Sequence, residues 1–133
     1  MSMSNSTENK TLKALLQGID IDFRASANLY LALFTADPTE SGVFTNEATY
    51  TGYARVAMPK ASSWTDGGST FTNATLLQFP QCTGGNNTIT HFALCTLASA
   101  GEIVVSGALN ASLNISSGIQ PQFSSASLSV GAD

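Results

Sequence analysis

The chain has 133 residues and a formal net charge of −4; 43% of the residues are apolar and only 11% are charged. This length suits a single domain, and an ordinary apolar fraction with few charges excludes a disordered chain. The five Lys and Arg residues form no basic stripe, which argues against nucleic-acid binding. No apolar run reaches the ~20 residues that a membrane-spanning helix needs.

The first residues, 1–7, are polar and lack the apolar core of a signal peptide, so we expect synthesis and first folding in the cytoplasm. We expect this segment to be mobile in the monomer. Asn5 or Thr7 is a candidate N-cap for the helix that follows, and Gly18 is a candidate C-cap.

The helix itself is predicted from Glu8 to Gln17, because Leu12, Leu15, Leu16 and Ile19 recur at helical spacing. A helix of two to three turns is not stable alone and must dock on something. Two surfaces are open to it: its own sheet or a neighbouring subunit.

After the helix the apolar pattern changes to the alternation of strands. Leu29–Phe34 is apolar on both faces, which predicts a central strand. Further strands are predicted at Tyr53–Met58, Thr70–Thr72, Leu76–Phe79, Ile89–Leu97, Ile103–Ser106, Leu113–Ile115 and Ser127–Val130.

Short strands separated by Gly- and Asn-rich turns indicate a mostly β fold. We predict an antiparallel β-sandwich, jelly-roll-like, with one short N-terminal helix. The whole chain, 1–133, is expected to be a single domain, with residues 1–19 as an N-terminal arm and helix and residues 20–133 as the sandwich.

The residues that carry chemistry are few. His91 is the single histidine and alternates with apolar neighbours, so we expect a packed, hydrogen-bonded side chain and not a general base. No Gly-x-Ser-x-Gly motif accompanies it, and Cys82, Cys95 and His91 do not have the clustered spacing of a zinc site. The two cysteines can pair if their strands are adjacent, but cytoplasmic folding favours free thiols. The sequence predicts no enzyme, no catalytic residue, no cofactor and no metal.

Most aromatic residues are expected in the core, namely Tyr30, Phe34, Phe71, Phe79, Phe92 and Phe123. Trp64 and Tyr50 lie near predicted turns and are open to contact with a sugar or a partner. As partner-contact residues we predict Leu12, Leu15 and Leu16 of the helix, together with Trp64.

The second half of the chain is nearly free of charge. From Ala61 onward the acids are Asp66, Glu102 and Asp133, and there is no Lys or Arg. A surface of Ser, Thr, Asn, Gln and Gly protects weakly against association. We expect copies of the chain or a partner to cover much of it.

Several segments, taken in order, resemble a known family. They are Leu29–Thr39, Gly52–Arg55, Phe79–Pro80 with its Gly-rich turn, Ile89–Leu94, Gly107–Leu109, Gln120–Phe123 and Ser127–Leu128. Together they are similar to small accessory proteins of tailed-bacteriophage virions, commonly described as minor tail, tail-fibre or capsid decoration proteins.

The resemblance implies a β-sandwich that assembles on a virion, made in the cytoplasm of the host bacterium. The expected function is that of a capsid decoration (cement) protein, which bridges and stabilises major capsid proteins. Its expected partners are the major capsid protein and copies of itself, as a homotrimer, with no nucleic acid and no membrane. Alternatives are a minor tail or tail-fibre protein that attaches to the host, touching host glycan, and a carbohydrate-binding module.

Overall fold

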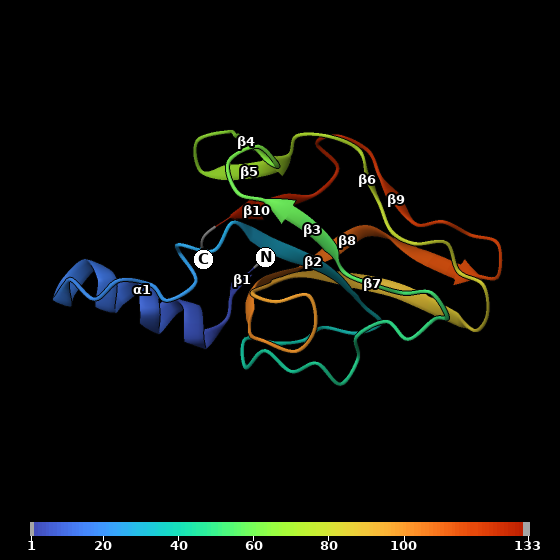
Figure 1. The fold of residues 1–133 in the computed structure, drawn as a ribbon, viewed down its shortest axis with the longest axis horizontal. Helices are drawn as coiled ribbons and strands as arrows, with labels where there is room; N and C mark the ends of the chain where they lie inside the picture. The colour runs from blue at the N-terminus through green and yellow to red at the C-terminus, as the bar shows by residue number, and fades with distance from the viewer. Residues whose placement is uncertain (1, 132–133) are drawn as a thin grey trace.

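The computed structural model describes residues 2–131, whose course is shown in Figure 1. These residues form one helix and ten strands. The elements are β1 (Ser2–Met3), α1 (Asn5–Gln17), β2 (Asn28–Phe34), β3 (Val56–Pro59), β4 (Trp64–Asp66), β5 (Thr70–Asn73), β6 (Leu77–Gln78), β7 (Asn86–Cys95), β8 (Ile103–Ser116), β9 (Gln122–Phe123) and β10 (Ser129–Gly131).

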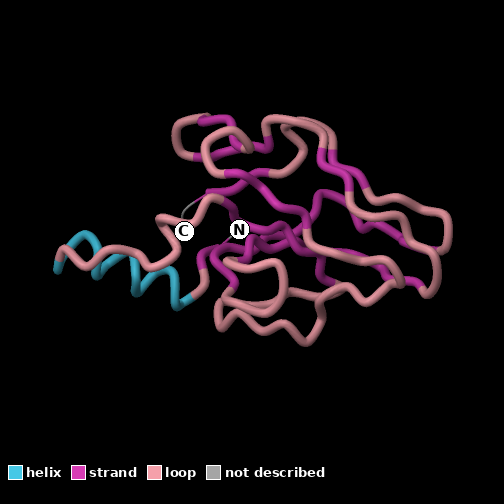
Figure 2. Tube along the Cα trace, viewed as in Figure 1, coloured by secondary structure: helices cyan, strands magenta, loops and turns pink. Residues whose placement is uncertain are grey.

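The strands form three sheets in which every pair is antiparallel. The largest has the order β1-β8-β7-β2-β3, a second has the order β10-β5-β4, and β6 pairs with β9 in a ribbon. Figures 1 and 2 show the small sheet and the ribbon on one side of the large sheet. The predicted class, mostly β with layered antiparallel sheets and one short helix, is confirmed.

Strand β2 is an interior strand of the large sheet, paired with β7 on one edge and with β3 on the other. Leu31 and Leu33 face the main core, where Phe92 and Phe79 are also buried. The alternate residues Ala32 and Phe34 belong to a second buried cluster. A strand with neighbours on both edges and cover on both faces has to be apolar throughout, which explains the sequence of β2.

The second cluster is closed by the loop that follows β2, through Phe44. Arg55 fixes this loop. Its Nε and Nη2 donate to the two carboxylate oxygens of Glu47 at 2.7 and 2.8 Å, and its Nη1 donates to the carbonyl oxygens of Leu97 and Ala100 at 2.8 Å each. The guanidinium also stands 5.0 Å from the centroid of the Phe44 ring. One side chain therefore joins the long loop to the turn between β7 and β8.

The Arg55–Glu47 pair is buried, with 3% of the Arg55 side chain and 18% of the Glu47 side chain exposed. The Tyr53 hydroxyl adds a donor to Glu47 at 2.7 Å and accepts from the Leu33 backbone N–H at 3.2 Å. Burial pushes the pKa of Glu47 up, but the hydrogen bonds from Arg55 and Tyr53 outweigh it and hold that pKa below its ordinary value. Burial and the bond to Glu47 both raise the pKa of Tyr53.

The expected mobile start is wrong for residues 2–7, while Met1 lies outside the described residues. Ser2 and Met3 pair with Ser106 and Val105 at the edge of β8, and Met3 packs on the main core.

The helix begins at Asn5, three residues before the predicted start. Its N-cap is Ser4, not Asn5 or Thr7, because Ser4 has the extended backbone that a cap needs and accepts from the Thr7 N–H. Gly18 ends the helix as predicted, in the left-handed conformation.

Strand β8 is one strand where the sequence predicts two, Ile103–Ser106 and Leu113–Ile115. The long strand β7 pairs with it from Asn86 to Cys95, with two register shifts, and keeps the small residues between those segments in the sheet. Strands β4 and β9 are absent from the sequence prediction. Three residues and two residues are too short for an alternation to be recognised.

Three aromatic predictions are wrong. Tyr30, predicted in the core, is only half-buried and belongs to neither buried cluster. Phe71, predicted in the core, is 41% exposed, because it lies on the short strand β5 where no further chain covers it. Tyr50, predicted near the surface, is only 3% exposed, and its hydroxyl donates to the Pro80 carbonyl at 2.8 Å. Cys82 and Cys95 are buried free thiols, in agreement with the expectation, and they belong to different buried clusters.

We predict that Arg55→Met lowers the free energy of unfolding by about 3 kcal/mol, because it leaves Glu47 buried without its counter-ion. Chemical denaturation measures the change. Arg24→Met is the matched control, since Arg24 makes the same two-pronged contact with Asp20 in full solvent. We expect no measurable loss there. Equal effects of the two substitutions would contradict a structural role for the buried pair.

A second prediction concerns acid. Because the pKa of folded Glu47 lies below its ordinary value of 4.5, this carboxylate stabilises the fold above that pH, and the contribution is lost as the pH falls through the folded pKa. We therefore expect Glu47→Gln to be clearly less stable than the wild type at pH 7 and the difference to shrink below about pH 4. Thermal unfolding across pH 3–7 measures this. A difference that stays constant with pH would contradict the assignment.

Candidate functional site

Helix α1 turns its apolar face away from its own body. Leu15 and Leu16 are 75% and 79% exposed, and Leu12 and Ile19 are exposed as well. Thr7, on the opposite side of the helix, is buried. Figure 1 shows the helix projecting from the sheets as an arm. An amphipathic helix that folds on its own domain has the reverse arrangement, so this face is unpartnered within the chain.

Polar contacts hold the arm in this orientation. The Ser4 and Asn5 N–H groups donate to the carbonyls of Val104 and Glu40 at 3.0 and 2.8 Å. Lys10 forms ion pairs with Asp22, in the segment that returns from the helix to β2, and with Glu102, just before β8. The first half of the helix is thereby fixed, and the half that carries the leucines extends beyond the body.

A groove of about 640 Å³ opens between the large sheet and the small sheet. Its lining residues are Met3, Leu29, Ala61, Trp64, Gly68, Ser69, Phe71, Leu94, Val104, Val105, Val130 and Gly131. Phe71 lies opposite Val130 in the β5–β10 pair and opposite Asp66 in the β4–β5 pair. Residues that lie opposite each other point to the same side of a sheet. The side chains of Phe71, Val130 and Asp66 therefore lie on the side of the small sheet that carries Trp64. The groove is almost wholly apolar, and its lining includes no ionisable side chain.

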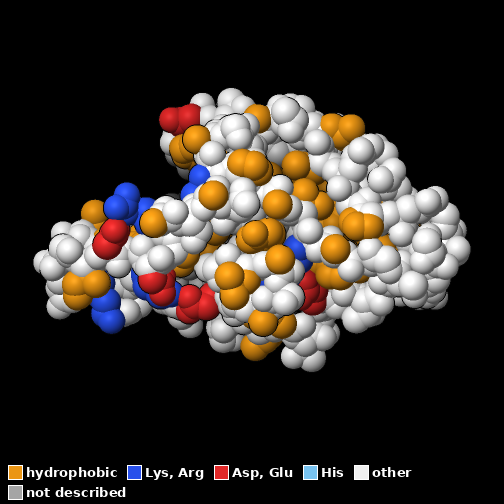
Figure 3. All heavy atoms as spheres, in the orientation of Figure 1, with side chains coloured by type: hydrophobic (Ala, Val, Ile, Leu, Met, Phe, Trp, Pro, Cys, Tyr) orange, Lys and Arg blue, Asp and Glu red, His pale blue; other side chains and the backbone are white. Residues whose placement is uncertain are grey.

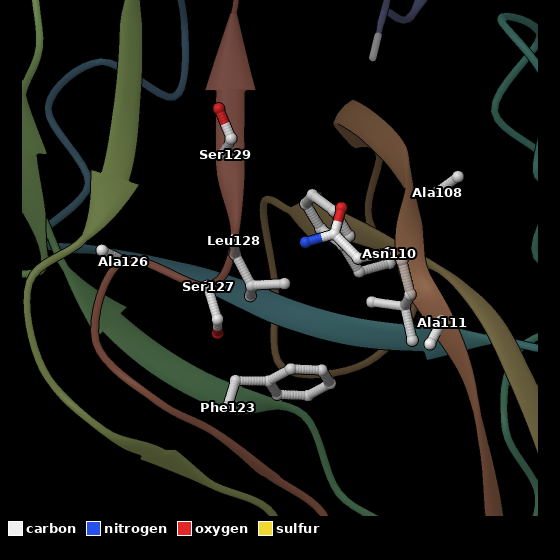
Figure 4. Close-up of a pocket in the computed structure, with 10 residues that line it drawn as sticks. Ala108, Asn110, Ala111, Phe123, Ala126, Ser127, Leu128 and Ser129 are labelled. Atoms are coloured by element: carbon white, nitrogen blue, oxygen red, sulfur yellow. The ribbon is translucent and has the colours of Figure 1, made fainter.

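A smaller hollow of about 280 Å³ lies at another part of the same interlayer space. Figure 4 shows Asn110 of β8 across from Leu128 and Ser129, with the ring of Phe123 below them. The Ser127 hydroxyl oxygen is buried there without a hydrogen-bond partner in the protein. This hollow is half polar in its lining and offers less apolar contact than the groove.

Charge is distributed unevenly over the surface. Figure 3 shows blue and red side chains mainly on the helical arm and the neighbouring part of the body, while the opposite end of this face is free of charge. This is the nearly chargeless second half of the sequence. Charged side chains are therefore concentrated on the arm and the adjoining part of the body, and one end of the body carries none on this face.

The single histidine and the acidic residues that follow the helix are engaged in hydrogen bonds or ion pairs. His91 is half-buried in β7, and its Nδ1 is hydrogen-bonded to the Thr90 hydroxyl at 2.8 Å. Asp20 and Asp22 pair with Arg24 and Lys10. Within residues 2–131, no three His, Cys, Asp or Glu side chains lie close enough together to hold a metal ion. No helix in the described part of the chain is both long and apolar enough to cross a membrane.

Comparison with protein families gives the decisive observation. The model of the family described as podophage GP4 fiber I protein gp80 matches residues 2–131. The chain belongs to this family. It is therefore a structural protein of the phage virion, assembled in the host cell, and the resemblance to virion accessory proteins is confirmed. No curated protein matches the chain.

The four predicted partner-contact residues lie on two surfaces of this family member. Leu12, Leu15 and Leu16 share the exposed face of α1, whereas Trp64 is partly buried in the groove. Their role in contacts stays a prediction. Sequence reasoning missed the rest of the groove lining, because the strands that carry Trp64, Phe71 and Val130 are too short to show an alternation.

We predict that Leu15→Gln with Leu16→Gln leaves the stability of the monomer within about 0.5 kcal/mol of the wild type, because both side chains are already in water. Leu31→Ala in the core is the contrasting variant and should lower stability by about 3 kcal/mol. Urea unfolding of dilute protein, below any concentration at which copies associate, measures both. A large loss in the helix variant would show that the leucines pack on their own domain.

Proposed function

We propose that this chain is a component of the phage's tail-fibre apparatus and not a cement protein of the capsid. The observation that carries the proposal is the match of a fibre-protein family over residues 2–131. The tail-fibre alternative fits that family better than cement does. The proposed partners accordingly change from the major capsid protein to other fibre or tail subunits and to copies of this chain.

The form of the molecule supports a role in attachment. A fibre subunit has to bind neighbours along an assembly, and such contacts bury apolar surface that is exposed in the isolated subunit. Here the arm presents four large apolar side chains, Leu12, Leu15, Leu16 and Ile19. The groove supplies a second apolar surface on the same chain.

We further propose that the protein acts by binding and catalyses no reaction. What supports this is the composition of the groove, whose lining contains no titratable side chain. Glu47, Tyr53 and Arg55 line another hollow, but their polar groups are engaged in hydrogen bonds with one another. General acid–base or nucleophilic chemistry requires such groups at the place where a substrate sits.

The test is the position and copy number of the chain in virions of the phage that encodes it. Heads and tails are separated and the chain is quantified in each by mass spectrometry. We expect the chain in the tail fraction, at a few to dozens of copies per particle. This range follows from the small number of fibres on one tail and not from the fold.

Particles that lack the chain should adsorb poorly to the host but keep their DNA on heating. Recovery in the head fraction at hundreds of copies, with heads that leak DNA when the chain is absent, would overturn the proposal and favour cement. Since Ser2 and Met3 belong to the large sheet, the arm is best disabled by substitution in α1 and not by deletion of the N-terminus.

A further inference from the structure

Two apolar surfaces of the chain have no partner within it. One is the apolar face of the arm, formed by Leu12, Leu15 and Leu16 of α1 with Ile19 just after it, and the other is the groove between the large and small sheets. The chain's own helix does not fill its own groove, because the backbone bonds at Ser4 and Asn5 and the ion pairs of Lys10 hold it outward. Figure 3 shows the outline of the molecule notched between the arm and the lobe that holds β4 and β5.

We propose that the groove of one copy receives the α1 helix of a second copy. This pairing names a partner for the proposed fibre component. It rests on the proposed function only for the location of the assembled chains in the virion. The helix is about 20 Å long at 1.5 Å per residue, and its leucines form the i, i+3, i+4 ridge that an apolar groove accepts. The groove offers Trp64 and Phe71 as the aromatic anchors that such contacts favour.

The charges beside the two surfaces are complementary. Lys13 adjoins Leu12 and Leu16 on the helix, and no ion pair in residues 2–131 involves it. Asp66, also outside those ion pairs, lies on β4 between Trp64 and Gly68 of the groove lining. Opposite charges at the helix and at the rim favour a copy of this chain over a strongly acidic or strongly basic partner.

The position of the helix relative to the groove allows copies of the chain to form a closed assembly. Met3 lines the groove, and the helix begins two residues later, so on every chain the helix starts beside the groove and carries its leucine face outward from it. Two copies that exchange helices form a closed dimer, and copies that pass the helix in one direction form a ring. In either case every helix and every groove is occupied.

Complementation between two variants tests this arrangement. The first, Leu15→Glu with Leu16→Glu, disables the helix and keeps the groove. The second, Ser69→Glu with Phe71→Glu, disables the groove and keeps the helix. All four positions are exposed, so both chains should fold, which circular dichroism checks. Gln17→Glu on α1 and Thr65→Glu on the other side of β4 each add one carboxylate to the same element and are the controls for added charge.

Sedimentation of the purified proteins gives the result. We expect the wild type and both controls to associate, and each disabled variant to show at least about a 100-fold higher dissociation constant. An equimolar mixture of the two disabled variants should form a complex of two chains, one of each kind, because a single intact helix and a single intact groove remain. That complex should not grow further.

Three outcomes would overturn the proposal. A wild type that stays monomeric at all accessible concentrations would show that no copy occupies the groove. A groove variant that still associates would show that helix faces pair with each other. A mixture that fails to form the two-chain complex would contradict the pairing of these two surfaces. Because these measurements use purified protein, their failure is separate from a failure of the head-and-tail assignment.

Cysteine trapping gives a second readout that needs no charged substitution. Leu16→Cys with Ser69→Cys should form disulfides between chains under mild oxidation, since the native Cys82 and Cys95 are buried. Covalent dimers or rings in the double variant, and none in either single variant, are expected. A disulfide within one chain would show that the helix folds back into its own groove and would overturn the proposal.

Discussion

Both faces of the five-stranded sheet are apolar, and the rest of the structure depends on how each face is covered. On one face the cover is the loop after β2, which Arg55 joins to Glu47 and to the turn between β7 and β8. On the other face the cover is a sheet of only three strands and a short ribbon. Three strands do not extend over five, and the groove is the part of the interlayer space that remains open. The shape of the molecule and its candidate site have this single origin.

The sequence predicted the features that depend on local pattern. Apolar residues on both faces of Leu29–Phe34 indicated a central strand, and the leucine spacing with Gly18 indicated the helix and its end. Features that depend on a distant partner were not predictable. The sequence around Arg55 does not indicate that this side chain binds the carbonyls of Leu97 and Ala100. These groups lie more than forty residues away and become its acceptors only when the loop folds. The choice of Ser4 over its polar neighbours as N-cap depended on the backbone entering the helix from β1.

The same limit applied to the candidate site. The leucine pattern established that α1 has an apolar face, but the direction of that face is set by Lys10, Asp22 and Glu102, which are far apart in the sequence. Trp64 was recognised as a candidate because it lies near a predicted turn. That it shares a groove with Phe71, Val130 and Met3 follows from strand pairing, and short strands leave too little alternation to reveal it. The chargeless second half, by contrast, is visible in the sequence and corresponds to the neutral end of the body.

Polar contacts fix the arm of this virion protein on the body and leave the apolar side of the arm exposed. A cryo-electron microscopy map of the intact virion tests this account most directly, because it shows both the location of the chain and what covers α1. The account predicts density for the chain in the fibre apparatus, with Leu15 and Leu16 inside the groove of a neighbouring copy. Density on the capsid lattice, with α1 against the major capsid protein, would contradict it.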